Sequence, residues 1–157
     1  MKIIDKYGDS VQFPASLHIL VLLDSLYEKK SFAPHDHLLK WEEAFQELKI
    51  PVYVVSPDDR YHVAHSSFHY VYNMDRSLYI KNDLVRTKYV FGKEYHLIYP
   101  CMLLMDGTQV IAKTYRLSER GIGQVYLKAL KIRYTQKKEK IERMLKEHPR
   151  KEDQELS

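Results

Sequence analysis

The sequence is poor in cysteine: Cys101 is the only one among 157 residues. A single cysteine cannot form a disulfide or a redox pair within the chain, so any disulfide would have to be intermolecular. Apolar runs long enough to cross a membrane are also lacking, and residues 1–5 do not resemble the start of a signal peptide. These absences exclude a disulfide scaffold and a transmembrane segment, and they lead us to expect a cytoplasmic location.

The composition that remains is that of one globular domain. The length is sufficient for a packed core without disulfides or metals, and 45% hydrophobic with 29% charged residues is typical of a soluble protein. The formal net charge of +4 is modest, but its basic residues gather toward the C-terminus. We therefore expect a single domain with a basic C-terminal segment.

Two apolar segments predict the centre of the fold. Residues 17–23 form an unbroken apolar run apart from His18, which predicts a strand buried on both faces, as in a parallel sheet. Residues 52–55 predict a second strand that stops at the turn signal of residues 56–59. The residues between them that have the spacing of one helix, ended by Pro51, are Leu38, Leu39, Trp41, Phe45 and Leu48. Strand, helix and strand form a crossover unit, whose functional site is expected beyond the carboxyl ends of the strands.

Residues 18–59 resemble a peroxiredoxin in hydrophobic pattern and spacing. The family pattern is a strand, a loop with Thr-x-x-Cys, a long helix and a second strand that ends in Val-Ser. The resemblance places Ser31 at the peroxide-attacking cysteine, Glu28 at the threonine and Pro34 within the same altered site. A cysteine ionises near neutral pH, whereas the alcohol of Ser31 needs a partner base, so peroxidase chemistry by the usual route is not expected.

The loop before the predicted helix has two interpretations. Ser31 or Asp36 can cap exposed backbone N–H groups, and Pro34 is tolerated in a first turn. Alternatively, a hydroxyl at a helix N-terminus beside Lys29 and Lys30 forms a polar pocket that favours anions. Such a pocket could hold a ligand without reacting with it.

Residues 96–107 carry a second resemblance. They are similar to the thioredoxin-like hairpin in which a cis-proline precedes a buried strand that ends in an Asp-Gly turn, with residues 108–114 as the partner strand. The resemblance places Pro100 close to Ser31 in space. Peroxiredoxins also keep an arginine near this point to polarise the peroxide, and none occurs between residues 88 and 113. A second catalytic element is therefore absent.

Cys101 follows Pro100 and would lie beside this site. Free cysteine is among the most buried residue types, so Cys101 can be a small core residue. The alternative is a reactive thiol, which needs exposure and positive neighbours such as Lys29 and Lys30.

The middle of the chain gives shorter patterns. Residues 1–4 and 10–13 predict a small hairpin, and residues 61–72 predict a helix. The resemblance implies a short strand at residues 78–80 and a small helix at residues 85–91. Histidines that could share a metal ion on the 61–72 helix are His62, His65 and His69, and His35 and His37 lie in another loop. The alternative to a metal site is a solvated or interface histidine face.

A long helix is predicted to begin at Ser118, with a core-facing stripe formed by Val125, Tyr126, Ala129 and Leu130. Gly121 and Gly123 lack the remainder of a phosphate-binding fingerprint. Beyond residue 132 the chain turns basic around a thin apolar line of Ile141, Met144 and Leu145. The candidate partner-binding residues there are Lys137, Lys138, Arg143 and Lys146. This extension is either a solvated helix, a docking element for a partner or a second copy, or a basic surface for acidic membrane or nucleic acid. No aromatic interleaving supports nucleic acid.

The sequence predicts a thioredoxin-like α/β domain over residues 1–132, with a central mixed β-sheet, flanking helices and a long C-terminal helix. Residues 133–157 form a basic helical extension and a polar tail. The predicted function is a redox-degenerate, non-catalytic binding or protein-interaction module without a cofactor, using the pocket around Ser31 and Pro100 or the terminal helix. A one-cysteine thiol oxidoreductase that uses Cys101 with an external thiol, and a histidine-based metal carrier, are the alternatives.

Overall fold

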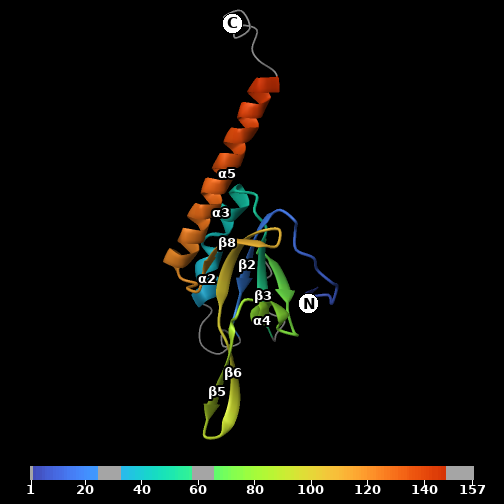
Figure 1. Ribbon diagram of the computed structural model, residues 1–157, viewed down its shortest axis with the longest axis vertical. Coiled ribbons are helices and arrows are strands. Elements are labelled where there is room, and N and C mark those ends of the chain that lie inside the picture. Colours follow the sequence, from blue (N-terminus) through green and yellow to red (C-terminus); the bar gives the residue numbers. More distant parts are fainter. Residues whose placement is uncertain (1, 25–32, 58–65, 148–157) are drawn as a thin grey trace, which may run out of the picture.

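The computed structural model describes residues 2–24, 33–57 and 66–147 (Figure 1). Its centre is a six-stranded mixed sheet with strand order β1-β4-β3-β2-β7-β8. The strands of this sheet are β1 (Ile4–Asp5), β2 (Leu17–Leu22), β3 (Val52–Ser56), β4 (His69–Tyr72), β7 (Cys101–Asp106) and β8 (Gln109–Thr114). A separate two-stranded hairpin consists of β5 (Val85–Val90) and β6 (Lys93–Ile98). The helices are α2 (Ala33–Leu39), α3 (Glu42–Glu47), α4 (Ser77–Lys81) and α5 (Glu119–Glu147).

The two apolar segments are parallel neighbours at the middle of the sheet, as predicted. All six residues of β2 are buried, and β2 pairs in parallel with β3, with Ile19 opposite Val52. On its other side β2 pairs antiparallel with β7, where Leu22 lies opposite Cys101. The predicted hairpin of β7 and β8 is also present, and Gly107 at its turn has a φ of 60°, which glycine adopts without strain.

The helices cover the two faces of the sheet unequally. Helices α2, α3 and α5 lie on one face, where Leu38, Phe45 and Ile122 join its apolar residues in one core cluster (Figure 1). The short helix α4 lies on the other face, where Leu78 and Tyr79 join a second cluster. Both faces of the central strands are therefore covered, which explains their continuous apolar sequence.

The single helix predicted between β2 and β3 is instead two short helices. The chain breaks between α2 and α3 at Trp41, whose backbone N–H donates to Leu38 at 3.0 Å. The break lets the indole ring lie against α5, 5.1 Å from the ring of Tyr126. Packing between elements has overridden the helical periodicity here.

Three local predictions in the middle of the chain are wrong. Residues 69–72 form a strand rather than the end of a helix, because this aromatic and β-branched stretch pairs with β3. Residues 78–80 belong to a helix, since Asn73 and Asp75 accept hydrogen bonds from the N–H groups of Leu78 and Ser77. Residues 85–90 form a strand.

The β5–β6 hairpin projects from the sheet at the end of the molecule opposite α5 (Figure 1). Its turn is formed by Phe91 and Gly92, with φ values of 51° and 76°. Two-residue hairpin turns of this kind usually carry Asn-Gly or Asp-Gly, so Phe91-Gly92 is a weak turn signal. The predicted N-terminal hairpin is reduced to β1 and one antiparallel bridge between Ile4 and Ser10.

Helix α5 begins as predicted, with the hydroxyl of Ser118 accepting a hydrogen bond from the N–H of Gly121 at 3.2 Å. Val125 and Ala129 face the core, whereas Leu130 is exposed. Arg133 still holds the helix to the body, since its guanidinium donates to the carbonyl oxygens of Leu48 and Lys49 at 2.9 and 3.1 Å. From Tyr134 to Glu147 every residue is exposed, and this end of α5 projects beyond the sheet (Figure 1). None of the helices described here is long and apolar enough to cross a membrane.

Candidate functional site

A cleft of about 540 Å³ lies where β6 leads into β7, next to the carboxyl end of β2. The backbone N–H of Tyr99 donates to the carbonyl of Leu84 at 2.8 Å and so joins the base of the hairpin to the body. Pro100 follows at the same edge. The residues that line the cleft are Asp83, Leu84, Arg86, Thr87, Lys88, Tyr99, Pro100 and Tyr115. The predicted edge of the sheet therefore does carry a cleft.

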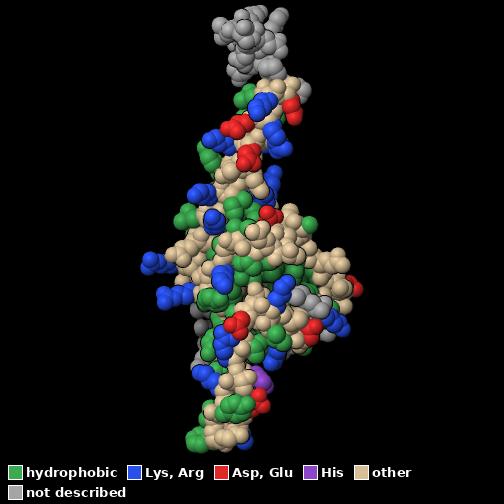
Figure 2. Space-filling view, in the orientation of Figure 1, with side chains coloured by type: hydrophobic (Ala, Val, Ile, Leu, Met, Phe, Trp, Pro, Cys, Tyr) green, Lys and Arg blue, Asp and Glu red, His purple; other side chains and the backbone are tan. Residues whose placement is uncertain are grey.

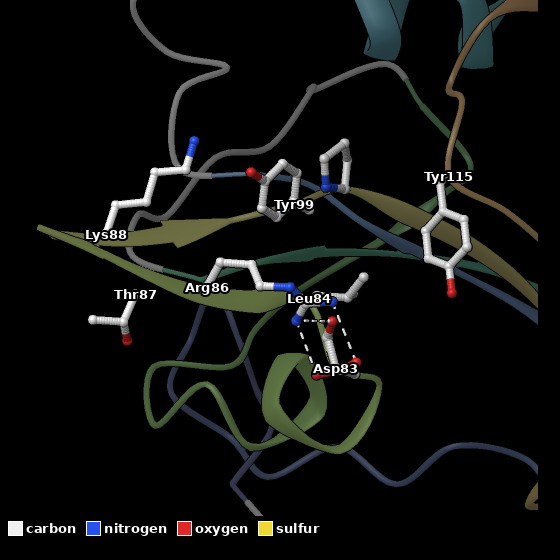
Figure 3. Close-up of a pocket in the computed structure, with 8 residues that line it drawn as sticks. Asp83, Leu84, Arg86, Thr87, Lys88, Tyr99 and Tyr115 are labelled. Atoms are coloured by element: carbon white, nitrogen blue, oxygen red, sulfur yellow. Dashed lines mark hydrogen bonds and ion pairs between the residues drawn. The ribbon is translucent and has the colours of Figure 1, made fainter.

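The charges in this cleft are largely paired. The two terminal nitrogens of Arg86 donate to the two carboxylate oxygens of Asp83 at 2.9 and 3.2 Å, and one of them also donates to the Asp83 carbonyl at 2.7 Å (Figure 3). A bidentate pair of this kind fixes the guanidinium plane. Lys88 lies toward the other end of the cleft from Tyr115 and points away from Asp83 (Figure 3). The described lining can hold a polar ligand, but it contains no thiol.

Tyr79 fills the space at the ends of the two parallel strands, and sequence reasoning missed this residue. Its side chain is fully buried, and its hydroxyl lies 2.7 Å from the carbonyl oxygen of Leu23 and 3.0 Å from that of Val55. The hydroxyl thus bridges the backbone at the carboxyl ends of β2 and β3. On the face covered by α4, the edge where such sheets usually bind ligands is filled by a side chain.

Cys101 is a core residue. Its side chain is 1% exposed and packs with Leu22, Val55 and Leu84 in the cluster on the α4 face. Burial raises the pKa of the Cys101 thiol to about 11, and the nearby charge of Lys113 offsets only part of this effect. The thiol is therefore protonated at neutral pH, which is the opposite of what a nucleophilic cysteine needs. It also faces away from the side of the sheet that α2 covers.

Several predicted site residues lie outside the described part of the chain, namely Glu28, Lys29, Lys30, Ser31, His62 and His65. Their roles stay predictions. Pro34 lies in the first turn of α2. Pro100 lies at the predicted edge, but the expected cis bond is wrong: the described peptide bonds are all trans, and β6 passes into β7 through Tyr99 and Pro100 without one.

The described histidines are dispersed. His69 lies on β4 and stacks on Tyr53, with ring centroids 4.8 Å apart, so the helical stripe predicted for it does not form. His35 is buried in α2, where its Nε2 lies 2.6 Å from the hydroxyl of Tyr70. Burial lowers the pKa of His35, although Asp36 and Glu42 act against this. Within residues 2–24, 33–57 and 66–147, no three potential metal ligands come together.

The projecting end of α5 carries the predicted partner-binding residues. Lys137, Lys138, Arg143 and Lys146 are all exposed there. Exposed apolar side chains accompany them, with Tyr134, Ile141 and Met144 at 69%, 46% and 55% exposure. Figure 2 shows the two kinds of side chain interspersed along this end of the helix.

Comparison with solved structures gives matches to peroxiredoxins. Peroxiredoxin Q of Xanthomonas campestris superposes with a TM-score of 0.64 at 16% identity, over 84% of this chain and 90% of that one. Peroxiredoxin 5 of Alvinella pompejana superposes with a TM-score of 0.58 at 11% identity, over 76% of this chain and 82% of that one. The mitochondrial 2-Cys peroxiredoxin of Plasmodium falciparum superposes with a TM-score of 0.57 at 10% identity, over 83% of this chain and 87% of that one.

No protein-family model and no curated protein sequence matches the chain. At such low identities the structural matches establish the fold alone. The predicted peroxiredoxin-like thioredoxin fold is thereby confirmed, with its mixed sheet and long C-terminal helix.

Proposed function

We propose that this chain is a non-catalytic protein with a peroxiredoxin-like fold, and that it acts as a protein-interaction module through the projecting end of α5. The observation that carries the proposal is the exposure of every residue from Tyr134 to Glu147 on a helix that extends beyond the body (Figure 1). Nearer its start, α5 packs on the sheet through the buried residues Ile122, Val125 and Ala129.

The state of the single cysteine supports the absence of thiol chemistry. The Cys101 thiol is buried, and its raised pKa disfavours the thiolate that would attack a peroxide or a disulfide. Use of Cys101 with an external thiol would first require the core on the α4 face to open. This weighs against the one-cysteine oxidoreductase.

The composition of the projecting helix supports binding. An exposed helix that only needs to be solvated is best made of polar residues throughout, whereas this one keeps large apolar side chains at Tyr134, Ile141, Met144 and Leu145. Folding of the body does not require them. We favour α5 over the cleft beside Pro100 as the binding element because Arg86 in the cleft is already paired with Asp83.

Site-specific photo-crosslinking in cells that produce the protein tests this proposal. A benzophenone amino acid replaces Ile141 on α5 in one variant and Ile80 on α4 in the other, since Ile80 is 64% exposed and lies on the body. We expect defined protein adducts from position 141 and none of them from position 80. Equal adducts from both positions, or none from either, would contradict the proposal.

A further inference from the structure

The exposed apolar residues of α5 follow a regular spacing. They follow one another at alternating intervals of three and four residues: Leu127, Leu130, Tyr134, Ile141 and Met144, with Lys137 at the position between Tyr134 and Ile141. All five are exposed, by 61%, 39%, 69%, 46% and 55% in that order. We call these five residues together with Lys137 the α5 seam. It is separate from the buried stripe of Ile122, Val125 and Ala129 that packs on the sheet.

A spacing that alternates between three and four residues is the mark of a coiled coil. It repeats every seven residues, and it makes a narrow apolar line rather than the broad face of a helix that lies on a core or a membrane. Tyr134, Lys137, Lys138 and Ile141 line a depression on the helix surface together with Glu142. Four residues at this spacing form the hole that receives one side chain of a facing helix.

The residues that flank the α5 seam are predominantly basic. In the register set by Tyr134 and Ile141, the flanking positions hold Lys131, Lys138 and Lys140. Arg133 is a fourth such residue, although its guanidinium is already held by α3. Leu145 and Glu147 are the exceptions at the far end of the helix.

This charge pattern distinguishes between possible occupants. A parallel second copy of α5 would place Arg133 against Lys138, and an antiparallel copy would bring the lysines of one flank against each other. Like charges at these positions oppose pairing. Lys137 would add a basic group to the contact itself. A helix with acidic flanks would instead meet an opposite charge at each of these positions.

We propose that the α5 seam binds an acidic amphipathic helix of another protein, which pairs with it as a coiled coil. The partner helix has an apolar seam, Glu or Asp at its flanking positions, and an acidic residue opposite Lys137. This inference rests on the proposed function and specifies the chemistry of the partner.

Two synthetic three-heptad peptides test the inference against the full-length chain. Both carry leucine along the seam; one has glutamate at the flanking positions and the other has lysine. Fluorescence anisotropy measures the binding of each labelled peptide. We expect the acidic peptide to bind at least about tenfold more tightly than the basic one, because several flanking pairs change from attraction to repulsion.

Two double substitutions of equal charge locate the contact. K138E/K140E reverses two flanking residues. R143E/K146E reverses the two predicted partner-binding residues that the seam register places off the contact. We expect K138E/K140E to lower the affinity of the chain for the acidic peptide by about tenfold. R143E/K146E should change this affinity by less than about threefold. Circular dichroism checks that both variants keep their helix content.

Other outcomes overturn the inference. Equal weakening by the two double variants would indicate diffuse attraction between charges, and preferential binding to anionic lipid vesicles or to duplex DNA would identify a different partner. A stable dimer of the chain that Ile141→Asp dissociates would identify a second copy. In each of these cases an absence of Cys101-dependent turnover would leave the non-catalytic part of the proposed function intact, so the two failures can be told apart.

Discussion

The carboxyl edge of the parallel strands buries its apolar side chains, whereas the projecting end of α5 exposes them. At the strand edge, Tyr79 and Cys101 are almost completely buried and fit the core on the α4 face. On α5, Tyr134 and Ile141 have the same apolar character but remain about half exposed or more. Folding accounts for the apolar residues of the first region and not for those of the second. Tyr79 and Cys101 thus contribute to the core, whereas the exposed apolar residues of α5 contribute little to it.

A matched pair of leucine substitutions gives the largest expected contrast between the two regions. Leu104 is fully buried in the central sheet, and Leu145 on α5 is 52% exposed. Leu104→Ala should lower the free energy of unfolding by about 2–5 kcal/mol because it leaves a cavity, whereas Leu145→Ala should change it by about 0.5 kcal/mol or less. Urea denaturation measures both. Similar losses from the two variants would mean that the end of α5 packs on the body.

Two glycines sharpen the account of how α5 is attached. A Cβ at position 121 would overlap the backbone oxygen of Arg116, whereas one at position 123 would lie 3.3 Å from the ring of Trp41, which can shift. Gly121→Ala should therefore lower the free energy of unfolding by about 1–3 kcal/mol. The matched Gly123→Ala should lower the free energy of unfolding by a smaller amount. Thermal denaturation of the two variants compares these losses. A more damaging Gly123→Ala would contradict this packing.

The hydroxyl of Tyr79 can be removed without changing the shape of the ring. Tyr79→Phe leaves the carbonyl oxygens of Leu23 and Val55 without this donor, so the free energy of unfolding should fall by about 1–2 kcal/mol. Tyr134→Phe on α5 is the control and should have no measurable effect on urea denaturation. An unchanged stability in Tyr79→Phe would show that the bridge between the strand ends contributes little.

Acid should destabilise the body through His35. Burial holds its pKa below the usual 6.5, so the unfolded chain takes up a proton at a higher pH than the folded chain does. The contribution of neutral His35 to the free energy of unfolding is therefore fully present above pH 6.5. It is lost as the pH falls through the lower pKa that His35 has in the folded state. The free energy of unfolding should thus decline more steeply below pH 6.5 in the wild type than in His35→Gln. Equal slopes in the wild type and in His35→Gln would contradict this prediction.

The sequence alone predicted the centre of the sheet well. The unbroken apolar run of β2 and the Asp-Gly turn after β7 are strong local signals, and both led to the correct strands. Short segments were less predictable because their structure depends on neighbours far along the chain. Residues 69–72 are a strand because β3 lies beside them, and α4 is a helix because Asn73 and Asp75 satisfy its first N–H groups.

The candidate site stays a prediction where it rests on Glu28 and Ser31, which lie outside the described residues. The register of β2 with β7 places Pro100 at the expected edge, yet Tyr79 was read as part of a strand and its role at the strand ends was missed. A tyrosine hydroxyl finds its acceptors only once the strands are assembled. The basic character of the α5 extension was visible in the sequence, whereas its separation from the body depends on where the helix packs.

The reactivity of Cys101 tests most directly whether this chain binds rather than performs thiol chemistry. A thiol reagent is applied to the native and to the urea-unfolded protein, and peroxide consumption in the presence of an external thiol is compared between the native chain and Cys101→Ser. The account predicts labelling of Cys101 only after unfolding, together with equal peroxide consumption by the two proteins. Rapid labelling of the native protein, with turnover that disappears in Cys101→Ser, would contradict it.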